Sequence, residues 1–416
     1  MEWKPYQEPW AASGQIVGWI GCYQHLPDRV PHTGHVGSDR WVVAASSVDS
    51  RTDPERVVLR SVSVGGFTKL IFAPARTMAE GTLRITLLAY LFATVLWAQV
   101  PSAWHDPSKH QVQFVTVEDG VQLEVLDWGG TGRPVVLLAG YNTAHVYDGF
   151  AEELAQTNHV YGITRRGYGM SSRPDLGYTA RHSAEDVLRV LDSLQVVAPV
   201  LAGHSFGGQD LTTLGATNPD RIAGLIYLNS AEDPTLVWSD YGLDVSPSQH
   251  QEIMKDLPAE MRSRPSPADK TYQAYRGSQS KRGVAVPESE LRQLFTANTD
   301  GTMGKYPAHR VREAIYKGRQ KPNYAAIQAP ILALFAMPPT LDEQIDRYQP
   351  QNASERAAME HDRAVTLAIK ATFMRDLQTG APGAQITKLQ GANFYIFLSN
   401  EADVLREMRT FITQLR

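Results

Sequence analysis

The chain has 416 residues, of which 43% are hydrophobic and 20% charged, a composition typical of a globular protein with a large core. Its formal net charge of −4 and its pI near 6.3 argue against nucleic acid or an anionic membrane surface as a partner, because both require a basic surface. Cys22 is the only cysteine, which excludes an intramolecular disulfide, a thiolate metal site and a cysteine nucleophile in the main domain.

The chain opens with a segment unlike the rest. Residues 1–77 are rich in Trp, Pro, Gly and Ser and show no sustained helical period, so we expect an extension with little stable structure. In residues 78–104, Arg84 precedes an apolar run of about fourteen residues, Ile85–Ala98, and small residues follow it. This pattern is typical of a signal peptide and favours a protein exported to the periplasm or the medium.

Two other interpretations of this run stay open. The uncharged stretch 85–104 is long enough to cross a bilayer as an uncleaved membrane anchor, and the same apolar residues suit a buried helix.

From Gln111 onward, strand-like and helix-like stretches alternate. Residues 111–117 and 121–128 flank Asp119-Gly120, a hairpin turn signal. Such alternation predicts an α/β fold, with a mostly parallel, doubly wound sheet built from residues 105–233 and 330–416. Further strands are expected at 134–138, 159–163, 200–202, 222–228, 331–335 and 385–389, and helices from a Ser183 cap, at 206–218, around 363–377 and at the C-terminus.

Residues 234–329 interrupt this alternation. They are rich in Lys, Arg, Gln, Ser and Pro, with helical patches at 249–261 and 287–296. A connection of about a hundred residues is too long for a simple loop, so we expect an inserted helical cap.

One short motif carries chemistry. Gly203-His204-Ser205-Phe206-Gly207 has the form G-x-S-x-G and stands between a predicted strand and a predicted helix. Glycines permit the tight turn, and the serine hydroxyl projects at the helix N-terminus, where negative charge is favoured. The motif predicts that Ser205 is a nucleophile; the alternative is a glycine-rich turn without a ligand.

Over roughly three quarters of the chain, these motifs resemble a capped α/β hydrolase. Val135–Asn142 is similar to the family's strand and oxyanion loop, Arg166–Ser171 to its R-G-x-G-x-S loop, and Gly391–Phe397 to the segment with the catalytic histidine. The resemblance implies that Gly140 belongs to the oxyanion loop and that the backbone N–H groups of Tyr141 and Phe206 bind the oxyanion.

The acid of the expected triad has three candidates. Asp233 and Glu232 follow the strand after the motif, and Asp342 follows the strand after the cap. We favour Asp233 over Asp342, although each also suits a helix cap or an exposed loop. Asn229, at the end of the first of these strands, is neutral.

The base departs from the family's pattern. Phe394 occupies the slot of the histidine, and no histidine follows His361. Loss of a triad member typically lowers kcat by about 10⁴- to 10⁶-fold. His145 follows the oxyanion loop and is the best substitute, although a packing role there is favoured; His204 is expected to pack behind Ser205.

The resemblance therefore implies a serine hydrolase that cleaves an ester or similar acyl bond of an apolar small molecule, impaired by Phe394. The alternatives are a catalytically silent binding protein that keeps the pocket and a deliberately inactivated variant. No metal-ligand cluster and no dinucleotide fingerprint is visible in the sequence, so no cofactor is expected. The sequence predicts neither the natural substrate nor the oligomeric state.

Overall fold

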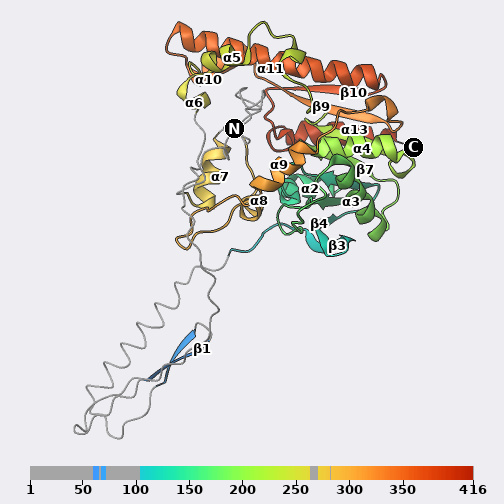
Figure 1. Ribbon diagram of the computed structural model, residues 1–416, viewed down its shortest axis with the longest axis vertical. Helices are drawn as coiled ribbons and strands as arrows, with labels where there is room; N and C mark the ends of the chain where they lie inside the picture. The colour runs from blue at the N-terminus through green and yellow to red at the C-terminus, as the bar shows by residue number, and fades with distance from the viewer. Residues whose placement is uncertain (1–59, 65–66, 72–103, 263–269, 282, 416) are drawn as a thin grey trace, which may run out of the picture. The chain divides into compact units, whose positions relative to one another are not determined.

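The main body of the protein is a sheet of eight strands with helices on both faces (Figure 1). The computed structural model describes residues 60–64, 67–71, 104–262, 270–281 and 283–415. The strands of the main sheet are β3 (Gln111–Glu118), β4 (Val121–Gly129), β5 (Pro134–Leu138), β6 (His159–Ile163), β7 (Val200–His204), β8 (Gly224–Leu228), β9 (Ile331–Met337) and β10 (Gln385–Gln390).

The order of the strands is β10-β9-β8-β7-β5-β6-β4-β3. All neighbours from β10 to β6 run parallel, whereas β4 is antiparallel to both β6 and β3. The sheet therefore combines a parallel centre, buried on both faces, with an antiparallel hairpin at one edge.

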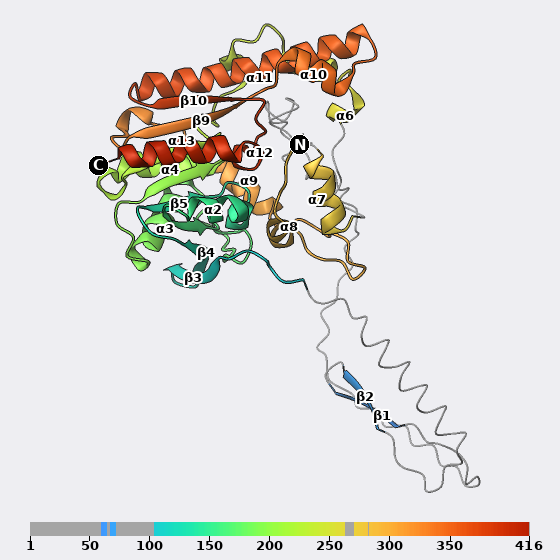
Figure 2. The same cartoon turned by 180° about the vertical axis from the view of Figure 1, so that it is seen from behind.

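Apolar residues of each central strand alternate between two cores. In β5, Val135 and Leu137 belong to one cluster, whereas Val136 and Leu138 belong to the other, as the period of two in a strand requires. Helices α2 (Asp148–Leu154) and α13 (Glu401–Gln414) cover the first face; α3 (Ala180–Ser193), α4 (Gly207–Thr217) and α11 (Ala353–Gly380) cover the second. Figure 2 shows the same layers from behind.

Helices follow β8 and precede β9 in the segment expected to form a cap. They are α5 (Pro247–Met254), α6 (Ala259–Arg262), α7 (Tyr272–Ser280), α8 (Glu288–Leu294) and α9 (His309–Lys317).

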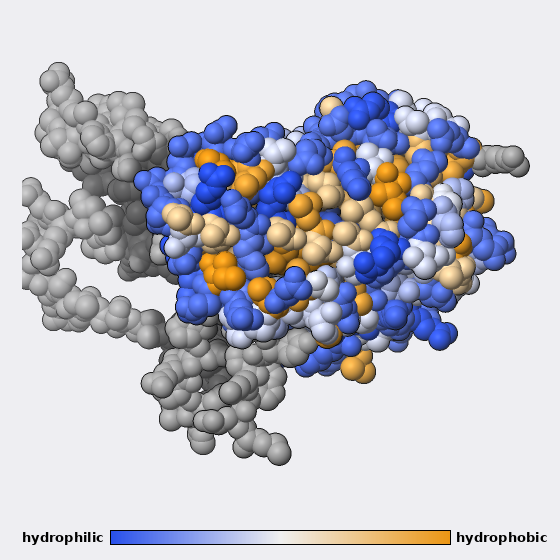
Figure 3. Space-filling model, turned by 90° about the horizontal axis from the view of Figure 1, so that it is seen from above, coloured by the Kyte–Doolittle hydropathy of each residue, from blue (hydrophilic) through white to orange (hydrophobic). Residues whose placement is uncertain are grey.

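These helices divide between two places. In the α5–α6 region, Leu257 forms a small cluster with Ala358 and Met359 of α11, whereas Tyr275 of α7 and Leu291 of α8 join the first core. Seen from the side on which α11 lies, apolar residues gather in patches among hydrophilic ones (Figure 3).

The fold class predicted from the sequence is confirmed: an α/β-hydrolase arrangement with a mixed, mostly parallel sheet flanked by helices. One local prediction was wrong. Ser183 is not the cap of α3; the helix begins at Ala180, and the Thr179 side chain accepts the His182 N–H at 3.2 Å.

The N-terminal region is described only in part. β1 (Arg60–Val64) and β2 (Phe67–Ile71) pair as antiparallel strands, while the rest of the expected extension 1–77 and the apolar run 85–98 lie outside the described residues. Within the described residues, no helix combines the length and apolar character that crossing a bilayer requires.

Candidate active site

Ser205 lies in a sharp turn between β7 and α4. Its φ is 53°, a left-handed conformation that L-residues rarely adopt. The turn needs glycines, because a side chain at three positions would meet a backbone oxygen. A Cβ added to Gly203 would lie 2.7 Å from the carbonyl oxygen of Gly207, and one added to Gly207 would lie 2.4 Å from that of Leu138. A Cβ added to Gly208 would lie 2.1 Å from the carbonyl oxygen of Ser230. Ser205 is half-buried, as a nucleophile at a site entrance must be.

The loop after β5 approaches this turn closely. A Cβ added to Gly140 would lie 2.9 Å from Ser205 Oγ and 2.8 Å from the Phe206 backbone nitrogen. The rings of Tyr141 and Phe206 pack with their centroids 4.4 Å apart. Residues 140–143, which we call the 140–143 loop, thus approach the Ser205 turn through Gly140 and Tyr141.

A carboxyl group from α8 holds the same loop. Glu290 is fully buried and accepts hydrogen bonds from Asn142 Nδ2 at 2.9 Å, from the Thr143 N–H at 3.2 Å and from the Thr143 hydroxyl. Burial raises the pKa of Glu290 to about 7. The Tyr395 hydroxyl donates to Asn142 Oδ1 at 3.2 Å, so the C-terminal segment also contacts this loop.

Phe394 lies in that C-terminal segment, between β10 and α12 (Ile396–Ser399). Its side chain is half-buried and packs against the same core as Tyr141 and Phe206. Its carbonyl oxygen lies 3.1 Å from His204 Nε2 and accepts from Asn229 Nδ2 at 3.3 Å.

His204 is buried among aromatic rings. Its ring centroid lies 4.6 Å from that of Phe394, 4.9 Å from Tyr395 and 5.2 Å from Phe397. Burial lowers the pKa of His204 to about 3, so the imidazole stays neutral at physiological pH. Its interactions lie behind Ser205, in the core.

Asn229 directly follows β8 and has a φ of 53°. Its Oδ1 accepts from the Ala336 N–H at 3.1 Å and from Lys370 Nζ at 2.9 Å. Lys370 is itself buried, and burial lowers its pKa against the pull of Glu232, 3.9 Å away. The side chain that faces the Phe394 carbonyl is therefore a neutral amide.

The candidate acids Asp233 and Asp342 lie in other settings. Asp233 is buried, and its Oδ1 accepts from the N–H and the hydroxyl of Thr235 in the turn after β8. Asp342 is exposed in the first turn of α10 (Leu341–Tyr348), where the helix N-terminus favours a negative charge. Among the described residues, neither aspartate forms a hydrogen bond or an ion pair with residues 391–397.

His145 is buried in the 3-10 turn η3 (Ala144–Tyr147), directly after the 140–143 loop. Its Nε2 lies 3.4 Å from Glu124 Oε1 and its Nδ1 lies 3.5 Å from Asp148 Oδ2. His110 Nδ1 lies 2.8 Å from Asp148 Oδ1. The sequence reasoning missed this grouping because His110 is distant along the chain; only the His145–Asp148 spacing of three gave a signal.

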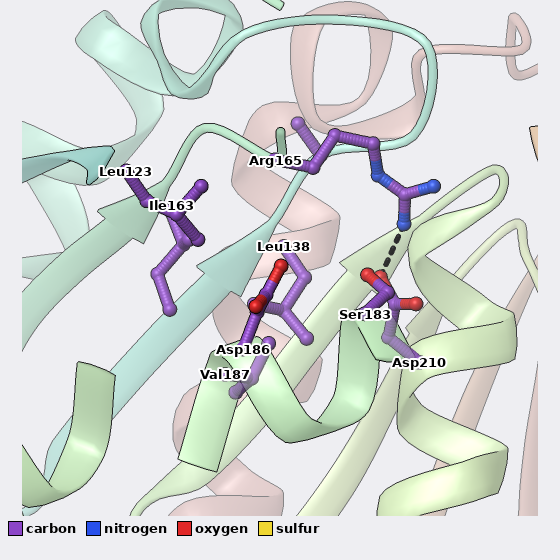
Figure 4. Close-up of a pocket in the computed structure, with 9 residues that line it drawn as sticks. Leu123, Leu138, Ile163, Arg165, Ser183, Asp186, Val187 and Asp210 are labelled. Carbon is purple, nitrogen blue, oxygen red and sulfur yellow. Dashed lines mark hydrogen bonds and ion pairs between the residues drawn. The ribbon is translucent and has the colours of Figure 1, made fainter. Parts of the chain in front are cut away.

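A small pocket is lined by Arg165, Ser183, Asp186 and Asp210 together with apolar side chains of β4, β5, β6 and α3 (Figure 4). Arg165 points toward Asp210 of α4 and forms an ion pair with it, while Arg166 binds both Asp186 oxygens at 2.7 Å. Burial raises the pKa of both aspartates. These ion pairs anchor Arg165 to α4 and Arg166 to α3.

In the part of the chain that the structure describes, no hydrogen bond joins the Ser205 hydroxyl to another side chain. The arrangement places Gly140 close to the Ser205 hydroxyl and to the Phe206 backbone nitrogen. Phe394 and Asn229 are joined to each other through the Phe394 carbonyl oxygen. Such a site supports nucleophilic attack on a carbonyl but shows no base for the hydroxyl proton.

Comparison with known proteins identifies the family of the chain. Residues 135–376, more than half of the chain, match the alpha/beta hydrolase family. The chain is 30% identical over 147 residues to a bifunctional esterase/perhydrolase of Acinetobacter calcoaceticus, covering 35% of this chain and 52% of that protein. It is 34% identical over 139 residues to a non-heme chloroperoxidase of Streptomyces lividans, covering 32% of this chain and 49% of that protein.

The chain thus spans about half the length of the curated relatives it matches. Among solved structures, E-2-(acetamidomethylene)succinate hydrolase superposes with a TM-score of 0.52 at 15% identity, covering 73% of this chain and 99% of that one. At that identity the likeness concerns the fold. With the sheet order, the Ser205 turn and the family match in agreement, the chain belongs to the α/β hydrolase family.

Proposed function

We propose that the protein cleaves an ester or similar acyl bond, with Ser205 as the nucleophile. The observation that carries the proposal is the close approach of Gly140 to Ser205 Oγ and to the Phe206 nitrogen. In this proposal the N–H groups of Tyr141 and Phe206 stabilise the oxyanion of the tetrahedral intermediate. One such donor is typically worth about 3 to 4 kcal/mol in the transition state.

Phe394 occupies the position of the general base in this proposal, which makes turnover slow. A phenyl ring accepts no proton, and Asn229, which faces the Phe394 carbonyl, carries no negative charge to stabilise an imidazolium. His204 cannot compensate, because its Nε2 faces that same carbonyl within the core. Asp233 and Asp342 remain candidates for the acid, and Asn229 marks a third position for it.

The proposed substrate is a small molecule with an apolar acyl group. The half-buried side chains beside Ser205 include Tyr141, Phe206 and Phe394, which offer an apolar, aromatic wall. An esterase activity stands in the name of the Acinetobacter relative.

A second candidate function is binding without turnover. Two neutral side chains, Phe394 and Asn229, favour it. Phe394 cannot accept the proton of the Ser205 hydroxyl, and Asn229, which donates to the Phe394 carbonyl, carries no negative charge to stabilise a protonated base. The same residues fit a deliberately inactivated variant.

The experiment restores the base and then the acid. Hydrolysis of a p-nitrophenyl ester is measured for three variants: Phe394→His, Phe394→His combined with Asn229→Asp, and Phe394→Gln. The last variant introduces a polar side chain that cannot act as a base. We expect Phe394→His, alone or with Asn229→Asp, to raise kcat/KM at least about 10²-fold, and Phe394→Gln to change it little. Replacing Asp233 or Asp342 by Ala in the Phe394→His background identifies the acid.

The contrary result is that both histidine variants keep their fold, as judged by circular dichroism, and still show a kcat/KM no higher than that of Phe394→Gln. This result would contradict the proposal that the protein is a hydrolase lacking only its base and counter-charge. It would favour the binding protein instead. Loss of the basal activity in His145→Ala, with the Tm unchanged, would point to His145 as the base.

A further inference from the structure

We infer that His110, His145 and Asp148 form a binding site for a divalent transition-metal ion of the zinc type. We call these three residues the His–His–Asp cluster. Their ligand atoms lie within 4.8 Å of one another, and the three side chains are at most 5% exposed. Imidazole nitrogens and a carboxylate oxygen are the ligands that zinc takes at sites with three protein ligands.

The spacing of the atoms suits a metal ion. His110 Nδ1 lies 2.8 Å from Asp148 Oδ1, and His145 Nδ1 lies 3.5 Å from Asp148 Oδ2. Two ligands of a tetrahedral zinc ion, with bonds of about 2.1 Å, stand about 3.4 Å apart. The separation between His145 and Asp148 agrees with this value, whereas that between His110 and Asp148 is a hydrogen bond that would have to lengthen when a metal ion binds. The imidazole planes of His110 and His145 are nearly perpendicular, at 81°.

The proton count at His145 gives an independent argument. A neutral imidazole carries one N–H, yet both ring nitrogens of His145 face carboxylates: Nε2 lies 3.4 Å from Glu124 and Nδ1 lies 3.5 Å from Asp148. In either tautomer, one ring nitrogen therefore presents a lone pair to a carboxylate. A metal ion bound at Nδ1, with Nε2–H donated to Glu124, is an arrangement in which both nitrogens and both carboxylates have partners.

The surroundings favour the metal ion. A ligating histidine usually donates its other ring N–H to a carboxylate, which is the relation of His145 to the buried Glu124. Asp148 is held in turn by the Ser289 hydroxyl.

The position of the cluster defines the role of the metal. His145 follows the 140–143 loop directly, while Ser289 and Glu290, adjacent in α8, contact Asp148 and that loop respectively. A bound ion would fix η3, α2 and α8 together beside the loop. We assign it a structural role, independent of the reaction proposed for Ser205.

The test titrates Zn²⁺ into the purified full chain after treatment with a chelator, by calorimetry at pH 7.5, together with the Tm. We expect Zn²⁺ binding that raises the Tm by several degrees and weakens at least about 100-fold in His145→Ala and in Asp148→Asn. Glu124→Gln should weaken binding about 10- to 100-fold, because it removes only the carboxylate behind His145.

The matched control is His159→Ala. His159 Nε2 lies 3.0 Å from Asp127 Oδ1 in a half-exposed pair, which has one histidine where the His–His–Asp cluster has two. Removing the His159 imidazole should therefore leave the Zn²⁺ affinity unchanged. The unaltered chain gives a second readout, because Co²⁺ bound with nitrogen ligands in tetrahedral geometry absorbs strongly in the visible range. No Zn²⁺ uptake and no such Co²⁺ band would overturn the inference. Undiminished uptake in His145→Ala would overturn it too.

Discussion

Ser205 and Asn229 share an uncommon backbone conformation at the carboxyl ends of adjacent parallel strands. Both have a φ of 53°, a conformation that costs on the order of 1–3 kcal/mol for a residue with a side chain. Contacts from outside maintain each one: glycines surround Ser205, and the Ala336 N–H and Lys370 hold Asn229. Ligands of open α/β sheets bind at this edge of the strands.

Gly140 provides a test of the loop that faces Ser205. Gly140→Ala places a methyl group 2.9 Å from Ser205 Oγ, so the loop must move away from the nucleophile. We expect the rate of Ser205 labelling by a fluorophosphonate probe to fall at least about 10-fold, in line with loss of one oxyanion donor.

Gly149→Ala is the matched control, because a Cβ there meets no atom within 4 Å and the residue lies in α2. It should leave the labelling rate unchanged. Equal rates for Gly140→Ala and the unaltered protein would show that the loop does not serve the nucleophile.

Glu290 predicts a pH dependence of stability. Its pKa is raised from 4.5 to about 7, so between these values the folded state binds more protons than the unfolded state. The stability that Glu290 contributes is fully present below about pH 4.5 and is lost as the pH rises through 7. Glu290→Gln should remove this fall, which urea unfolding of both proteins at pH 5 and pH 7.5 measures.

Glu288→Gln serves as control for Glu290, since Glu288 lies on the same helix and pairs with Arg292. It should keep the pH dependence of the unaltered protein. An unchanged difference between pH 5 and pH 7.5 in Glu290→Gln would contradict the assignment.

At the scale of elements, the strands could be predicted closely and the longest helix could not. The apolar runs at 134–138 and 159–163 coincide with β5 and β6, because a strand buried on both faces is apolar throughout. Helix α11 was expected only around 363–377 but begins at Ala353. Its first turns carry few apolar residues, so the sequence shows little helical pattern there. In the folded protein, Ala358 and Met359 in these turns pack against Leu257.

The same distinction applies to the site. The Ser205 turn is local in sequence, so a motif could reveal it. Glu290 contacts Asn142 from a sequence separation of 148 residues, and His110 meets Asp148 from 38 residues away. Their proximity depends on how α8 and the segment before β3 pack, which no local pattern encodes.

The helices of residues 234–329 pack in two different places, and a pair of matched leucine variants tests whether only one of these places supports the site. Leu291 of α8 packs in the core beside the site, and Leu257 packs against α11; both are buried. Replacing either leucine by Ala should cost about 2–5 kcal/mol of stability. Only Leu291→Ala should also slow Ser205 labelling under native conditions, since α8 holds the 140–143 loop through Glu290. Equal slowing by both variants would contradict this division.

At the scale of the whole molecule, residues 104–415 supply the eight-stranded sheet and both of its cores. We expect a chain that begins at Trp104 to keep the Tm of the full chain within a few degrees. This agrees with the hypothesis that 78–104 is an export signal or an anchor. A much lower Tm, or failure to fold, would count against it.

The central claim is that Ser205 is an acyl-accepting nucleophile. Reaction of the unaltered chain with a fluorophosphonate probe, followed by mass spectrometry of its peptides, tests this most directly. The account predicts a slow adduct on Ser205 that is absent in Ser205→Ala and forms faster in Phe394→His. An adduct that persists in Ser205→Ala, or no adduct on Ser205 in either the unaltered chain or Phe394→His, would contradict it.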